Sequence, residues 1–311
     1  RWQMLVTAQR DPYALEGRGG CLLRLSSADL RHWRVEGPAL APGSASVPEC
    51  PNGFHWNGWY YLLFGLGLQT HYRLSRELWG PWLRPAVDTL DNRALAVLKT
   101  APFGDRRIGA AWVGTRQGDS DEGRLQWGGN IVLREIVQRP DGTLGTRFVP
   151  ELIPAATPAL RLACEPLTAG TTCAPDSFRL DATTALEVAA AAGLPLDYRL
   201  RCHVRPCGPC ARFGLGLRGS GGMARQIELA FHGHTGMVSL GDQRLEGVAG
   251  LDQPFDVEIV AKGDLIDVSL SGGRCLINHL PSLRGDRLFL FAEGGQVAFE
   301  EIALEPLRTR S

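Results

Sequence analysis

The 311-residue chain is predicted to be an all-β protein with two successive domains. Residues 1–150 contain short apolar runs with turn signals about every ten positions, and helical periodicity is almost absent. Beyond residue 160 the pattern changes to clean alternation of apolar and polar residues, as in 255–259 and 265–270. Alternation of this kind is typical of antiparallel sheets with one buried and one solvated face.

The first part, 1–150, is predicted to form strands separated by Gly, Pro, Asn and Asp turns. We expect these strands at 2–8, 20–26, 53–56, 59–65, 70–75, 95–100, 108–113 and 129–137. Such a series fits a β-propeller or a β-sandwich. At about ten residues per strand and turn, it amounts to about three blades of four strands.

A segment rich in Pro, Ala and Thr, 151–159, is predicted to link this part to a β-sandwich at 160–311. The run 185–192 is the one plausible helix, but its flanks favour a short turn or an alanine-rich strand. The end of the chain, 288–299, resembles the last hairpin of a lectin-like jelly roll.

Charge and composition exclude several classes of protein. Lys and Arg together number 33 and so do Asp and Glu, so the net charge is zero and neither a nucleic acid nor a membrane surface is an expected partner. No apolar run is long enough to span a bilayer. We expect the eight cysteines to be mostly reduced and buried, and we expect no cofactor and no metal. The sequence does not indicate an oligomeric state.

The chain begins at Arg1 with a run that already reads as a buried strand. We therefore expect a fragment that lacks its N-terminal part, where any localisation signal would lie.

The most informative segment places one carboxylic acid before a β-hairpin. Asn57-Gly58 joins two short aromatic and apolar runs, which is a strong signal for a hairpin turn. Glu49 precedes the first run and stands between Pro48 and Pro51, which stiffen the approach. A general acid would benefit from this setting. The alternative is a glutamate that only caps a loop.

Four segments, in order along the chain, resemble glycoside hydrolase family 32, the group of β-fructofuranosidases, invertases, inulinases and levanases. They are Ser26-Ser27-Ala28-Asp29-Leu30-Arg31-His32-Trp33, Pro48-Glu49-Cys50-Pro51, Thr70-His71-Tyr72-Arg73-Leu74 with Gly80-Pro81-Trp82, and Trp127 to Glu135 with Arg139-Pro140-Asp141-Gly142-Thr143-Leu144. Each motif alone is weak, and the ordered set is fairly specific. It covers about the first half of the chain.

This resemblance implies a partial five-bladed propeller followed by a jelly-roll-like sandwich, and a carbohydrate as the partner. It also implies retaining hydrolysis of a fructosyl bond by two carboxyl groups about 5–5.5 Å apart. Glu49 matches the acid/base position of the family. We expect Phe54, Trp56 and Trp59 to give this acid the poorly solvated surroundings that keep it protonated.

Four further residues are candidates for substrate binding. Asp91 falls where the family has a sugar-binding aspartate, although Asp-Asn pairs are frequent in turns. Trp127, like Trp112, could stack on a sugar face, and a buried core tryptophan is the alternative. His71 and Tyr72 begin a strand near the expected central axis, and a structural role is the alternative for both.

Arg10-Asp11-Pro12 resembles a family motif whose aspartate stabilises the transition state. In the family, however, that motif precedes a strand similar to Trp2–Ala8, whereas here it follows that strand. We therefore interpret Asp11 as a turn residue. In this register both the stabiliser and the nucleophile lie upstream of Arg1.

Cys207-Gly208-Pro209-Cys210 matches the dithiol motif of thioredoxins, but a strand pattern follows where that chemistry needs a helix. We interpret the match as accidental. A zinc site with Cys202 and His203 is disfavoured because neighbouring residues of a strand point to opposite faces. A strained disulfide between Cys207 and Cys210 is a further alternative.

Two hypotheses of function follow. The first is a retaining fructosyl hydrolase, present here as a fragment without its nucleophile and expected to hydrolyse sucrose or inulin negligibly by itself. The second is a non-catalytic carbohydrate-binding or structural β-module. A strand resembling W-x-N-D-P-N-G upstream of Arg1 in the gene would support the enzyme.

Overall fold

The computed structural model describes residues 1–10, 19–174 and 176–308. Within these ranges nearly all regular structure is β, and two short 3₁₀ helices, η1 (Gln117–Asp119) and η2 (Pro150–Leu152), interrupt the strands. The described part of the chain contains no helix long and apolar enough to cross a bilayer.

Backbone contacts divide the chain into two compact units. The first contains 1–112 and 131–145, and the second contains 113–130 and 146–311. The tip of one long hairpin, 113–130, therefore groups with the second unit. The boundary predicted at residue 150 remains a prediction.

The strands up to residue 147 form three antiparallel sheets among the described residues, each a meander of the kind found in propeller blades. The first sheet has the order β1 (Trp2–Gln9), β2 (Gly20–Ser27), β3 (Arg34–Leu40). The second is β4 (Glu49–Trp56), β5 (Trp59–Leu66), β6 (Gln69–Ser75), β7 (Thr89–Leu90). The third is β8 (Leu95–Phe103), β9 (Arg106–Arg116), β10 (Leu125–Gln138), β11 (Leu144–Arg147).

Local chemistry explains several of these turns. Trp56 pairs with Trp59 across Asn57-Gly58, and both turn residues have positive φ (45° and 78°), as a type I′ hairpin requires. Between β2 and β3, the Ser27 hydroxyl accepts hydrogen bonds from the backbone N–H groups of Asp29 and Leu30. The Asp29 carboxylate in turn accepts from the next two N–H groups. The serine and aspartate of this blade signature therefore shape a turn.

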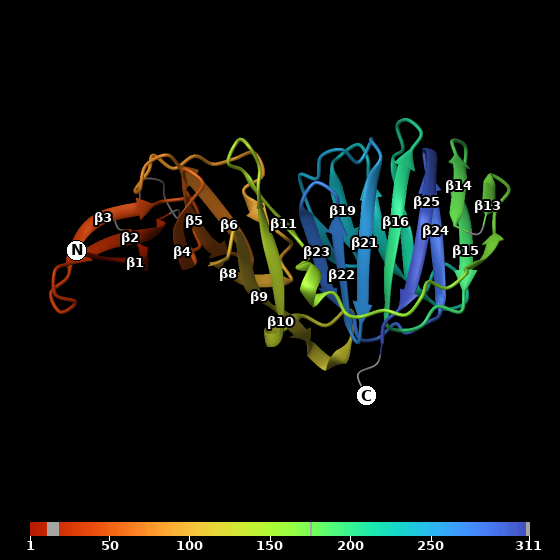
Figure 1. Cartoon of the computed structure of the whole chain (residues 1–311), viewed down its shortest axis with the longest axis horizontal. Coiled ribbons are helices and arrows are strands. Elements are labelled where there is room, and N and C mark those ends of the chain that lie inside the picture. Colours follow the sequence, from red (N-terminus) through yellow and green to blue (C-terminus); the bar gives the residue numbers. More distant parts are fainter. Residues whose placement is uncertain (11–18, 175, 309–311) are drawn as a thin grey trace. The chain divides into compact units, whose positions relative to one another are not determined.

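The second unit is a sandwich of two seven-stranded antiparallel sheets (Figure 1). One sheet has the order β12 (Ala163–Pro166), β15 (Glu187–Ala192), β24 (Arg287–Glu293), β17 (Arg212–Gly219), β18 (Ile227–His232), β19 (Met237–Leu240), β20 (Gln243–Leu245). The other is β13 (Thr171–Ala174), β14 (Ser177–Ala182), β25 (Gly295–Pro306), β16 (Tyr198–Pro206), β21 (Phe255–Lys262), β22 (Leu265–Leu270), β23 (Arg274–His279).

One hydrophobic core joins the two sheets of the sandwich. It takes Leu200, Ile259 and Val268 from one sheet and Leu215 and Leu290 from the other, all fully buried. In β21 and β22 every second residue is buried, so the predicted alternation is confirmed. Apolar side chains at that period account for the face-to-face packing of the sheets.

Two expectations for this unit can be compared with the structure. The alanine-rich run is a strand, β15, as favoured over a helix, and it pairs with β12 and β24. The hairpin predicted at 288–299 is wrong: β24 and β25 belong to different sheets, and the chain crosses between them at Gly294 (φ 68°). A Gly-Gly turn between two alternating runs has the sequence of a hairpin, but local pattern does not decide which sheet receives the second strand.

Candidate functional site

Glu49 is the first residue of β4 and lies opposite Gly65 of β5. The pairing of the two strands then breaks, and regular register resumes only at Asn52. Cys50, inside this bulge, has a positive φ of 49°, which is uncommon for a residue other than glycine. Bulges and strained backbone are frequent beside functional sites, where they aim a side chain.

Side chains from β8 hold this bulge in place. The Lys99 ammonium donates hydrogen bonds to the backbone carbonyls of Cys50 and, at 2.9 Å, of Pro51. The Asn52 amide oxygen accepts from the backbone N–H and the hydroxyl of Thr100, at 2.8 and 3.0 Å. Burial lowers the pKa of Lys99. The carbonyls after Glu49 are therefore fixed by a cation that the sequence analysis did not single out.

The surroundings predicted for Glu49 are not the ones observed: its side chain is exposed. The aromatic residues expected to cover it contact arginines instead. The Arg107 guanidinium lies 3.7 Å from the ring centroid of Phe54 and 5.8 Å from that of Trp56, and Arg76 lies 3.5 Å from that of Trp59. Cation–π contacts of this kind stabilise the blade and do not shield the carboxyl.

An aspartate that the sequence analysis missed is the centre of a buried polar cluster. The Asp88 carboxylate accepts from the Arg73 guanidinium at 2.5 Å and lies 3.0 Å from Arg84 Nε. His71 Nδ1 lies 3.5 Å from the same carboxylate oxygen. Burial alone would raise the pKa of Asp88, but the hydrogen bonds and charges of His71 and Arg73 lower it well below its usual range.

The two neighbours on β6 differ in their accessibility. His71 is partly exposed, at 18% of its side-chain surface, and stacks on Phe64. Tyr72 is fully buried, and its hydroxyl donates to the Val87 carbonyl and accepts from the Leu144 N–H. Alternation along the strand directs Tyr72 into the core, so the structure offers no support for its predicted substrate contact, which remains only a prediction. The contact predicted for His71 remains a prediction.

Register places His71 and Glu49 at the same end of one sheet. Gly65 pairs with Glu49 on one side and with Thr70 on the other, and His71 follows Thr70. Because neighbouring strands are about 4.8 Å apart, the backbones at these two residues are separated by roughly 10 Å.

Asp91 is not accessible to a sugar in this structure. Its carboxylate is 1% exposed and accepts a hydrogen bond of 2.6 Å from Arg134 Nε, whose side chain is also 1% exposed. Asp91 has a positive φ of 50°, which aspartate tolerates better than most residues. The geometry is that of a buried ion pair, so a sugar-binding role for Asp91 has no support here and remains only a prediction.

The two tryptophan candidates are in different environments. Trp127, in β10, is 73% exposed and belongs to the hairpin tip that groups with the second unit. Trp112, in β9, is half-buried. Stacking of either residue on a sugar remains a prediction. Asp11, interpreted as a turn residue, lies outside the described residues.

A cavity of about 490 Å³ lies in the first unit. Its walls are mainly aromatic and apolar, and Pro51 belongs to them, but Glu49 does not. The lining includes Phe54, His55, Tyr60, Trp79 and Trp82. Among the described residues that line it there is no carboxylate, so it does not supply the pair of carboxyl groups that retaining hydrolysis needs.

The cysteine motif of the second unit has no redox geometry. Residues 207–211 form the loop between β16 and β17, and no helix follows it. Burial raises the pKa of the Cys210 thiol, which is the opposite of what a reactive thiol needs. Burial also raises the pKa of Cys202 to about 12.

The alternation argument against a zinc site also agrees with the structure. His203 pairs with Asp256 at 2.7 Å on the other face of the sheet from Cys202. In the described residues no group of three or more His, Cys, Asp or Glu side chains is arranged to hold a metal ion.

Comparison with solved structures identifies the fold. A β-fructofuranosidase of glycoside hydrolase family 32 from Bombyx mori is similar over 99% of this chain and 63% of its own, with a TM-score of 0.63 and 14% identity. A sucrose-6-phosphate hydrolase from Lactobacillus gasseri is similar over 98% and 63%, with a TM-score of 0.63 and 13% identity. A family 32 glycoside hydrolase from Bifidobacterium adolescentis is similar over 93% and 46%, with a TM-score of 0.57 and 18% identity.

The chain thus spans about half to two thirds of the length of these structures. No protein-family model and no curated protein matches it by sequence. At these identities the similarity establishes the fold: a partial five-bladed propeller followed by a jelly-roll-like sandwich, as predicted from the sequence. The fold resemblance to family 32 is confirmed, and activity is a separate question.

Proposed function

We propose that this chain is the acid/base-carrying part of a retaining glycoside hydrolase that acts on fructosyl bonds. The observation that carries the proposal is the setting of Glu49, a carboxylate at the head of a strand, followed by a bulge with strained backbone that Lys99 holds. The fold, which is that of family 32 glycoside hydrolases, supports the same reaction class.

In this proposal Glu49 donates its proton to the leaving oxygen while a second carboxylate attacks the anomeric carbon. The glycosidic C–O bond breaks, and a covalent fructosyl–enzyme ester forms with release of the alcohol. Glu49, now ionised, takes a proton from water, whose oxygen attacks the same carbon and releases the second carboxylate. One bond to fructose is formed and one broken in each step.

The second carboxylate and the residue that stabilises the transition state are proposed to come from propeller blades that this chain does not include. A carboxylate about 5–5.5 Å from Glu49 would also supply the like charge that raises the pKa of a general acid. Fructose-containing sugars such as sucrose or inulin are the proposed substrates.

The test compares hydrolysis of sucrose and inulin by this chain and by the product of its complete reading frame. We expect negligible turnover by the chain alone. In the complete product, Glu49→Gln should lower kcat roughly 10²–10⁴-fold, the usual contribution of a general acid. Glu77→Gln, which changes an exposed glutamate of the same unit, is the matched control and should have no effect.

Turnover by the chain alone that disappears in Glu49→Gln would refute the proposal that its nucleophile lies elsewhere. Unchanged kcat in the complete Glu49→Gln variant would refute the role of Glu49.

A second candidate, a non-catalytic carbohydrate-binding module, is favoured by one observation, the solvent exposure of Glu49. The same assay separates the two candidates. A binding module retains its affinity for sugar in Glu49→Gln and hydrolyses nothing in either form.

A further inference from the structure

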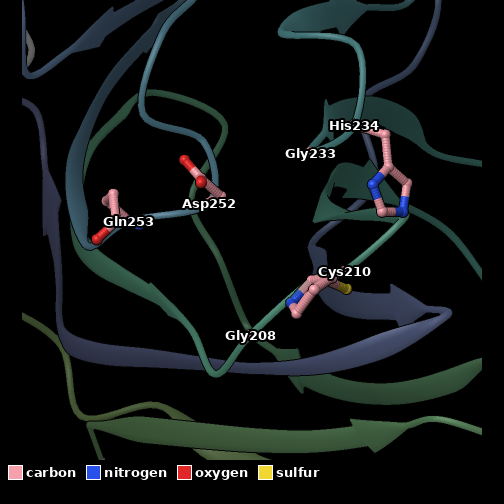
Figure 2. Close-up of a pocket in the computed structure, with 7 residues that line it drawn as sticks. Gly208, Cys210, Gly233, His234, Asp252 and Gln253 are labelled. Carbon is pink, nitrogen blue, oxygen red and sulfur yellow. The ribbon is translucent and has the colours of Figure 1, made fainter.

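A cavity of about 320 Å³ opens at one end of the sandwich, between three loops of the second unit (Figure 2). The loops connect β16 to β17, β18 to β19, and β20 to β21. Seven residues line the cavity: Gly208, Pro209, Cys210, Gly233, His234, Asp252 and Gln253. Its volume is at the lower end of the range of ligand pockets, which suits one small unit.

Each of the three loops is anchored by one buried phenylalanine. Phe213 follows the first loop, Phe231 precedes the second, and Phe255 follows the third. The three rings pack on one another, with centroids 5.1, 5.5 and 6.3 Å apart. Aromatic packing at these distances is favourable beyond burial alone, so the loops start from a common rigid base.

Backbone contacts fix the loops further. The Val248 N–H donates to the Gly236 carbonyl at 2.8 Å, which joins the second loop to the third. At Gly233 a Cβ atom would lie 2.4 Å from the Cys210 carbonyl, so only glycine permits this approach of the first two loops. The pocket is therefore formed before any ligand arrives.

Three polar side chains face the pocket without a partner. Asp252, Gln253 and His234 are exposed, and the side chain of none of the three has a hydrogen bond or ion pair with another described residue. Figure 2 shows Asp252 and Gln253 on one wall and His234 with Cys210 on the opposite wall. The Cys210 side chain is instead committed to the carbonyls of Arg212 and Glu293.

The chemistry of this lining limits the class of ligand that the pocket can bind. An anion is disfavoured because the lining contains a carboxylate and no arginine or lysine. A metal ion is disfavoured because His234 and Asp252 are the two ionisable donors that face the cavity, while burial raises the pKa of the Cys210 thiol. A carboxylate, an amide and an imidazole together accept and donate hydrogen bonds in the way that neighbouring hydroxyl groups require.

We propose that this pocket binds a single neutral sugar unit through its vicinal hydroxyl groups. The Asp252 carboxylate accepts from two adjacent hydroxyls, the Gln253 amide donates to one and accepts from another, and His234 closes the opposite side. The Pro209 ring offers an apolar surface to the C–H groups of the sugar. The site lies in the second unit, whereas Glu49 lies in the first, so the inference extends beyond the proposed hydrolysis.

The test is ligand-observed NMR titration of the intact chain with fructose, sucrose and inulin, with glucose as a second monosaccharide. A free sugar and the terminal unit of a polymer offer the pocket the same vicinal hydroxyl groups. Comparing the affinity for fructose and sucrose with the affinity for inulin shows which of the two the pocket prefers. Asp252→Ala and Gln253→Ala should each weaken binding at least tenfold. Glu246→Gln, a change of an exposed acid in the same loop outside the lining, should leave affinity unchanged.

Thermal unfolding of each variant serves as the control for folding, and we expect wild-type midpoints because the altered side chains are exposed. Binding by none of the sugars, or equal affinity in Asp252→Ala and the wild type, would overturn the proposal. So would binding that requires a divalent cation and disappears with a chelator. Glu49→Gln separates this site from the proposed function: loss of sugar binding in that variant would place the ligand in the first unit, against the inference.

Discussion

Replacing Asp91 by Asn is expected to destabilise the first unit by about 3–5 kcal/mol, the usual cost of breaking a buried ion pair from one side. Both side chains of the pair are 1% exposed, and Asp91 Oδ2 lies 2.6 Å from Arg134 Nε. Asparagine keeps the size of the residue and tolerates the positive φ of 50°. The substitution therefore removes the charge that faces the buried guanidinium and changes little else.

Urea unfolding followed by tryptophan fluorescence measures this effect. All of the eight tryptophans except Trp127 lie in the first unit, so the signal reports mainly on that unit. With a slope of about 2 kcal/mol per molar urea, the midpoint should fall by roughly 1.5–2.5 M. If the first unit of Asp91→Asn is already unfolded without urea, the loss of stability is larger still and the prediction also holds.

The control is Asp105→Asn, which changes an exposed aspartate of a turn in the same unit and should alter stability by less than about 0.5 kcal/mol. An Asp91→Asn protein as stable as this control would contradict the buried ion pair. If that protein also lost affinity for sugars, Asp91 would have the substrate-binding role predicted from the sequence.

Three further predictions concern other parts of the chain. The pKa of Asp88 is lower in the folded state than the ordinary value of about 4, so stability should fall as pH drops below about 4, because the unfolded chain takes up the proton first. In Asp88→Asn this loss of stability in acid, followed by fluorescence against pH, should disappear. An unchanged loss in that variant would show that the cluster does not lower the pKa of Asp88. Cys50 and Cys207 are the exposed thiols and should react fastest with a thiol reagent in the native protein, because the other six are buried or half-buried. An equally fast reaction in the doubly serine-substituted protein would contradict this difference in exposure. Gly142→Ala should cost about 2 kcal/mol or more, since its Cβ would lie 2.4 Å from the Trp59 ring, and more than Gly104→Ala, where the added atom meets nothing within 4 Å. Equal midpoints for these two variants would rule out the close approach.

Much of the fold could be predicted because each strand carries its own local signal. The Asn57-Gly58 turn and the alternation in β21 and β22 are properties of a few neighbouring residues. The strands that the prediction missed lack such signals. Gly37 and Pro38 interrupt β3, and β7 is only two residues long. The crossing of β24 and β25 into different sheets depends on distant strands, which no local pattern contains.

The candidate site was less predictable, since it depends on partners far apart in the sequence. Glu49 could be identified from its motif, but Lys99, 50 residues later, fixes the bulge beside it. Asp88 has no motif at all, and its importance follows from the basic residues that surround it after folding. That Lys99 is one of only two lysines in a chain rich in arginine was the one signal that could have drawn attention to it.

The most direct test of the proposed function is the dependence of catalysis on the leaving group in Glu49→Gln. In the product of the complete reading frame, kcat/KM is measured for sucrose and for a fructosyl substrate whose leaving group needs no proton. A proton donor at Glu49 predicts a loss of roughly 10²–10⁴-fold with sucrose and a much smaller loss with the activated substrate. Equal losses with both substrates, or no loss with sucrose, would contradict the assignment of Glu49 as the general acid.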